Sequence, residues 1–109
     1  MTKPTIDELQ SRLRDFAKAR EWEQFHNPKD LAISIAIESA EVLEVFQWKS
    51  PNDITELLAT HDGQAALADE LADVLIYLLR LADVTGIDLA TAAADKIKRN
   101  ETRFPTTGR

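Results

Sequence analysis

Apolar residues recur along the chain at the three- and four-residue spacing of amphipathic helices, and no stretch alternates apolar and polar residues as a strand would. The first helix is predicted over about residues 5–20, where Ile6, Leu9, Leu13 and Phe16 share one face. The pattern predicts the remaining helices over about 27–49, 50–59, 64–85 and 88–102. We therefore predict an all-α fold: a single domain over residues 1–109, built as a four-helix bundle-like subunit with one additional short helix.

Helix-end signals support these boundaries. Asn27-Pro28 and Ser50-Pro51 each place a capping residue before a proline at the first helical position. Gly86 follows the helix over 64–85 as a left-handed terminator, and Asp88 is the predicted N-cap of the last helix. The stretches 21–27 and 60–64 are predicted to be an irregular turn and a break.

The helix over 27–49 carries a glutamate inside its apolar stripe. At about 100° per residue, Leu31 and Val42 fall within about 40° of Glu38. A carboxylate in such a stripe is costly unless it is paired, protonated or bound to a cation. Glu70 occupies the same kind of position on the helix over 64–85, about 40° from Val74.

Each of these glutamates has a second acid three residues later, which is a neighbouring position on a helix surface. The pairs are Glu38 with Glu41 and Glu70 with Asp73. If the two long helices pack antiparallel through their apolar stripes, the four carboxylates converge and repel one another unless divalent cations intervene. Four oxygen ligands favour Mg²⁺, with Mn²⁺ as a substitute. Acid pairs at this spacing are also common on solvated helix faces, so the pattern alone leaves both interpretations open.

Charge and composition restrict the function further. The net charge is −6 and the pI is about 4.8, which argues against binding a nucleic acid polymer or an anionic membrane through a basic surface. The chain has no cysteine, so it has neither a disulfide framework nor a thiolate metal site. We find neither a signal-like start nor an apolar run of about 18 residues, and expect a cytoplasmic protein.

Four stretches of the chain carry a family resemblance. They are 20-REWEQFHNPKDLA-32, 38-ESAEVLEVFQW-48, 69-DELADVLIYLLRLAD-83 and 96-KIKRNETRFP-105. In these motifs the chain resembles the MazG-like all-α nucleoside triphosphate pyrophosphohydrolases, most closely the dCTP pyrophosphatase branch. The resemblance spans nearly the whole chain, and the two acid pairs match its metal-binding signature.

The resemblance implies Mg²⁺-dependent hydrolysis of a (d)NTP to the (d)NMP and pyrophosphate, with dCTP or a modified dCTP preferred, in the clearing of aberrant nucleotides. Glu38, Glu41, Glu70 and Asp73 are then the metal ligands, and Glu41 is the first choice for the catalytic base. The expected substrate-binding residues are Trp22, His26, Lys29, Trp48, Tyr77, Lys96, Asn100 and Arg103. Without the resemblance, the pattern favours tryptophans that anchor the core or an interface and basic residues that complement a helix dipole.

The two long helices look apolar around more than half of their circumference, and such helices must be covered on two sides. Together with the resemblance, this predicts a homo-oligomer, a homotetramer first and a dimer second. Glu44 is expected to be solvated or to lie just behind the metal ligands, and Asp69, Arg80 and Asp83 are expected to form solvated pairs on their helix. The rival hypotheses are a helical interaction module without catalytic activity and a di-metal carboxylate bundle of other chemistry.

Overall fold

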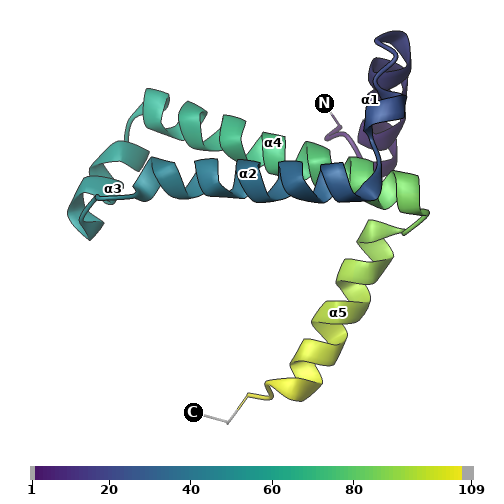
Figure 1. Cartoon of the computed structure of the whole chain (residues 1–109). Coiled ribbons are helices and arrows are strands. Elements are labelled where there is room, and N and C mark those ends of the chain that lie inside the picture. The colour runs from purple at the N-terminus through teal and green to yellow at the C-terminus, as the bar shows by residue number, and fades with distance from the viewer. Residues whose placement is uncertain (1, 107–109) are drawn as a thin grey trace.

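The computed structural model describes residues 2–106, which form five α-helices and one 3₁₀ turn and contain no β-strand (Figure 1). The elements are α1 (Ile6–Ala19), η1 (Glu23–Phe25), α2 (Pro28–Phe46), α3 (Pro51–Leu58), α4 (His61–Thr85) and α5 (Leu89–Arg103). The all-α prediction is therefore confirmed, and every predicted helix is present. None of these helices is long and apolar enough to cross a membrane.

The two long helices, α2 and α4, lie side by side and antiparallel, because α3 reverses the chain between them (Figure 1). Helix α1 crosses the C-terminal half of α4, where the Gln10 side-chain amide donates to the carbonyl oxygen of Leu79 at 3.2 Å. The apolar core lies at this crossing and is small. Its buried members are Ala17, Leu31, Leu79 and Ala82.

The predicted caps are present. The Asn27 side chain accepts a hydrogen bond from the Asp30 amide at 2.9 Å, and Ser50 forms a reciprocal capping box with Asp53. Gly86 ends α4 with φ of 73°, a left-handed conformation that glycine adopts without strain. These local signals fix where the chain turns, and hence how α2 and α4 face each other.

Two predicted boundaries were wrong by about three residues. Helix α4 begins at His61 rather than near 64, because the Thr60 hydroxyl caps the Gly63 amide at 2.9 Å and the break shrinks to two residues. Helix α2 ends at Phe46 rather than near 49, and Trp48 adopts a left-handed φ of 69°. That conformation is uncommon for a non-glycine residue, and it directs the chain away from the helix axis.

The single chain is open on one side. Helix α5 leaves α4 at Gly86 and extends away from the α2–α4 pair (Figure 1). The radius of gyration is 17.2 Å, whereas a compact chain of this length has about 13 Å. Large apolar side chains of the long helices remain exposed, namely Ile33, Ile37 and Leu43 on α2 and Leu71, Leu75, Ile76 and Leu78 on α4. An exposed apolar surface of this kind is typical of a site that contacts another molecule.

Gly63 provides a test of the α3–α4 junction. A Cβ atom at this position would overlap the carbonyl oxygen of Leu57, which is backbone and cannot rotate away. Although alanine favours helices over glycine by about 1 kcal/mol, we expect Gly63→Ala to lower the free energy of unfolding by about 1–3 kcal/mol. Denaturant unfolding at fixed protein concentration measures this change. A stabilisation by the variant would contradict the packing described for the junction.

Candidate functional site

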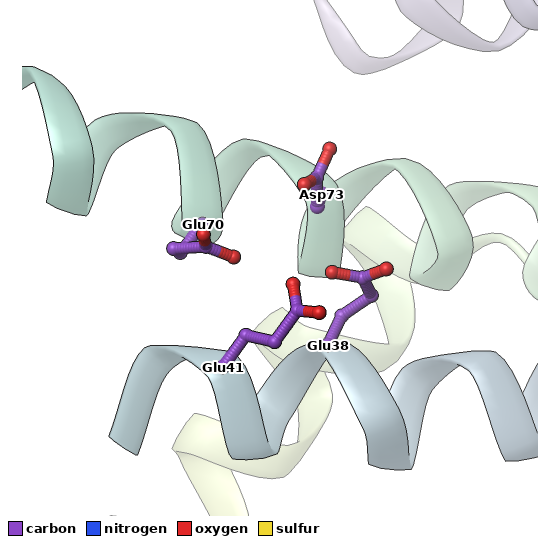
Figure 2. A group of neighbouring side chains, drawn as sticks. All are labelled: Glu38, Glu41, Glu70 and Asp73. Carbon is purple, nitrogen blue, oxygen red and sulfur yellow. The ribbon is translucent and has the colours of Figure 1, made fainter. Parts of the chain in front are cut away.

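Four carboxylates meet in the middle of the α2–α4 pair (Figure 2). Glu38 and Glu41 project from α2 and Glu70 projects from α4 into the space between the two helices, whereas the carboxylate of Asp73 on α4 is turned away from α2 in this view. One carboxylate oxygen from each of the four lies within 4.8 Å of the others. The structure thus brings together all four predicted metal ligands, and it does so through the antiparallel packing predicted for the two long helices.

The cluster holds unbalanced negative charge. The pKa of Glu38 is raised to about 7, first by its hydrogen bond with Glu41, then by burial and by the neighbouring negative charges. The pKa of Glu70 is raised by the same kinds of contact, with Glu41 again the first cause. Within residues 2–106 the only salt bridges lie on Asp83, so no lysine or arginine neutralises the cluster.

Two carboxylate oxygens of the cluster lack a hydrogen-bond partner, and they indicate which kind of ligand the cluster would bind. The Oε2 atoms of Glu38 and Glu70 are buried and have no hydrogen-bond partner among the described residues. A buried carboxylate oxygen without a partner is destabilising, and a divalent cation is a partner that several carboxylates can share. Oxygen-only ligands at this mutual distance fit Mg²⁺ or Mn²⁺, and a cluster without histidine or cysteine fits zinc, copper or iron poorly.

A pocket of about 560 Å³ opens next to the carboxylate cluster, between α1, η1 and α4. Three of the predicted substrate-binding residues line it, namely Trp22, His26 and Tyr77. Asp73 also lines the pocket, so one residue belongs to both the carboxylate cluster and the pocket wall. The Trp22 ring packs edge-on against Phe16, another lining residue, with 5.5 Å between ring centroids. A flat ligand in this pocket would therefore reach the carboxylates at one end.

The other predicted substrate-binding residues lie elsewhere in the single chain. Trp48 follows the C-terminal end of α2 and is 93% exposed, whereas Trp22 and His26 precede the N-terminal end of that helix. The 19 residues of α2 span about 28 Å, so Trp48 does not share this pocket within one chain. Lys96, Asn100 and Arg103 lie on the diverging helix α5, and Lys29 is exposed in the first turn of α2.

The expectation that Arg80 is solvated was wrong. Arg80 is only 6% exposed, lines the pocket and donates a hydrogen bond to His26 at 3.1 Å. A signal for this place was present in the sequence, because at about 100° per residue Arg80 falls about 20° from Asp73 on the same face of α4. The sequence pattern nevertheless predicts a solvated arginine on that face, because it does not show that η1 folds over it.

The chain is similar in sequence and fold to known proteins. The MazG-like family matches residues 33–108, which include all four carboxylates. The chain belongs to the MazG-like family. A crystal structure of a pyrophosphatase from Archaeoglobus fulgidus DSM 4304 superposes with a TM-score of 0.86 at 41% sequence identity, covering 97% of both chains. The resemblance noted in the sequence motifs is confirmed.

Two curated relatives are also similar to this MazG-like chain. It is 39% identical over 102 residues to dCTP pyrophosphatase 1 of Mus musculus, and 38% identical over 102 residues to dCTP pyrophosphatase 1 of Homo sapiens. Each match covers 94% of this chain and 60% of the relative. The chain therefore spans about 60% of the length of these curated relatives.

The raised pKa of Glu38 predicts how the stability of the metal-free protein depends on pH. Between the ordinary value of 4.5 and about 7, the folded state binds more protons than the unfolded state, so stability falls as pH rises through this window. In EDTA we expect the Tm to fall between about pH 5.5 and pH 8 and Glu38→Gln to flatten that fall.

The control is Glu44→Gln, which removes an exposed carboxylate from the same helix and should leave the pH dependence unchanged. Adding Mg²⁺ at pH 8 should raise the Tm of the wild type and of the control by more than that of Glu38→Gln. An equally steep fall in Glu38→Gln would contradict the electrostatic description of the cluster.

Proposed function

We propose that this protein hydrolyses a nucleoside triphosphate to the monophosphate and pyrophosphate with the help of Mg²⁺. The observation that carries the proposal is the shared residue Asp73, which joins a carboxylate cluster fit for divalent cations to a pocket with aromatic walls. A nucleotide has the matching parts, a flat base at one end and a polyanion at the other. The similarity to a pyrophosphatase and to dCTP pyrophosphatase 1 supports the same reaction.

In this proposal the carboxylates and the pocket walls have different roles in the reaction. Glu38, Glu41, Glu70 and Asp73 would hold the cation, which supplies charge neutralisation for the triphosphate and lowers the pKa of a water. Glu41 is the proposed proton acceptor, because it contacts both Glu38 and Glu70 and so stands at the centre of the cluster. The apolar walls of the pocket would limit access of other water to the reacting phosphate.

For the base we propose cytosine, as in dCTP or a modified dCTP. Trp22 offers an aromatic face for stacking, and His26 and Tyr77 line the same pocket with groups that hydrogen-bond. The relatives named dCTP pyrophosphatase 1 support this choice. Removal of unwanted deoxynucleotides from the cytoplasmic pool is the biological role that we propose.

We further propose that the active unit is a homo-oligomer, a homotetramer first and a dimer second. The exposed apolar side chains of α2 and α4, together with the extended shape, support a second copy lying on this helix pair. A second copy would also explain the exposed Trp48 and the basic residues on α5. We propose that these groups complete the pocket of a neighbouring subunit.

The central test is a panel of NTPs and dNTPs incubated with Mg²⁺ and assayed for pyrophosphate. We expect release, fastest from dCTP or a 5-modified dCTP, and a loss of about 100-fold or more in kcat for Glu38→Gln and Glu70→Gln. Glu44→Gln should retain wild-type activity, since its carboxylate is exposed and outside the cluster. Absence of pyrophosphate from every nucleotide would refute the activity and favour an interaction module.

Mixed oligomers test the shared site. Trp48→Ala should reduce kcat/KM by about 10- to 100-fold through loss of base stacking. If Trp48 serves the neighbouring subunit, co-refolding this variant with inactive Glu38→Gln at equal amounts should restore about a quarter of the wild-type sites. Each variant refolded alone is the control. Activity of the mixture equal to the mean of the two separate variants would place Trp48 outside the neighbour's site.

A further inference from the structure

One buried charged side chain, that of Arg80, has no role in the proposed hydrolysis. Arg80 on α4 is 6% exposed, and its guanidinium lies in the wall of the nucleotide pocket beneath η1. Burying an arginine is costly unless its donors are satisfied and its charge is paired. The two hydrogen-bond partners of Arg80 therefore explain how its burial is tolerated.

The guanidinium of Arg80 is held between a histidine and a carboxylate. Its Nε atom donates to Nδ1 of His26 at 3.1 Å, and its Nη1 atom donates to Oδ2 of Asp83 at 3.4 Å. The same Oδ2 atom accepts a 2.7 Å hydrogen bond from Nε of Arg14 on α1. Asp83 thus pairs with the positive charges of both Arg80 and Arg14 and links α4 to α1.

That contact determines which nitrogen of His26 carries the proton. A guanidinium only donates hydrogen bonds, so the Nδ1 atom facing it must be the unprotonated nitrogen of the ring. A neutral imidazole with a bare Nδ1 has its proton on Nε2. With Nδ1 occupied by Arg80, Nε2–H is the group that His26 has left to offer to the pocket.

We propose that Arg80 is a positioning residue that locks His26 in the Nε2–H tautomer, so that His26 meets the nucleotide only as a hydrogen-bond donor. The identity of the ligand rests on the proposed function, whereas the tautomer does not. The matching ligand atom is an acceptor. O2 of any pyrimidine qualifies, but ring N3 qualifies only in cytosine, since N3 of uracil and thymine carries a hydrogen.

The electrostatics around His26 act in the same direction. Burial and then the positive charge of Arg80 lower the pKa of His26, and the negative charge of Glu23 on η1 opposes this weakly. His26 is therefore neutral at pH 7 and above, and a neutral ring is the form in which a choice between tautomers exists. Neither Arg14 nor Asp83 contacts His26 in a hydrogen bond, so Arg80 is the group that makes this choice.

The first test reads the tautomer without any substrate. The chain contains two histidines, and His61 is exposed in the first turn of α4, which makes it an internal reference. In a long-range ¹H–¹⁵N spectrum of the labelled full chain at pH 8, with His61→Gln used for assignment, we expect a bare Nδ1 and a protonated Nε2 for His26. A protonated Nδ1, or the same averaged shifts as His61, would overturn the proposal.

Arg80→Met keeps the volume of the side chain and removes its donors. We expect the ¹⁵N shifts of His26 in this variant to move toward the averaged pattern of His61. The matched control is Arg14→Gln, which breaks the other hydrogen bond to Asp83 and should leave the His26 shifts unchanged. Circular dichroism and thermal unfolding verify the fold of both variants. Unchanged His26 shifts in folded Arg80→Met would overturn the proposal.

A kinetic cycle separates positioning from mere structural support. Arg80→Met should raise KM for dCTP by about 3- to 10-fold, the effect of one neutral hydrogen bond, and leave kcat nearly unchanged. In a His26→Ala background the same substitution should have no further effect on KM, because Arg80 acts through His26. Equal losses in both backgrounds would refute the positioning role.

The nucleotide assay tests the proposed function and the NMR spectrum tests the tautomer, so either proposal can fail without the other. If no nucleotide is hydrolysed but the NMR spectrum shows a bare Nδ1 that depends on Arg80, the proposed function fails and the tautomer assignment stands. If nucleotides are hydrolysed while His26 shows a protonated Nδ1, the assignment fails and the proposed function stands.

Discussion

The repulsion among four carboxylates between α2 and α4 is the interaction on which the rest of the structure depends. Two long helices could pack more stably with apolar side chains at these positions, yet the chain places Glu38 and Glu70 there with buried oxygens that have no partner. The pKa values of both groups are raised, first by the hydrogen bond with Glu41 and then by burial and the neighbouring negative charges, so the crowded cluster resists full ionisation. Folding thus brings four negative charges together before any cation binds. Relief of their repulsion would supply the affinity of the site for a divalent cation.

The same helix pair explains why the single chain looks incomplete. One face of α2 and of α4 carries the carboxylates. The remaining apolar faces of these two helices contact α1 or are exposed to solvent. Helix α5 extends away from the pair, and Trp48 stands at the end of α2 opposite to the pocket. A second copy lying on the pair would cover the apolar faces and bring distant polar groups to the site. Assembly and catalysis are therefore expected to be linked.

Much of this arrangement could be predicted from the sequence, because it depends on local rules. The two acid pairs at helical spacing, the caps at Asn27 and Ser50 and the terminator Gly86 each act within a few residues of the chain. The burial of Arg80 could not be predicted in this way. It depends on η1 folding over α4 and on α1 crossing it, contacts between segments 54 and 69 residues apart. For the same reason the sequence did not show that the length of α2 separates Trp48 from Trp22 within one chain.

Cation binding by the four carboxylates is tested most directly in a crystal of the wild-type chain that is soaked with Mn²⁺ and measured near the manganese absorption edge. Mn²⁺ accepts the same oxygen ligands as Mg²⁺ and can be located by anomalous scattering. We expect an anomalous peak within coordination distance, about 2–2.5 Å, of carboxylate oxygens from both α2 and α4, including Glu38 and Glu70. An ordered cluster with no peak in millimolar Mn²⁺ would contradict cation binding by the four carboxylates.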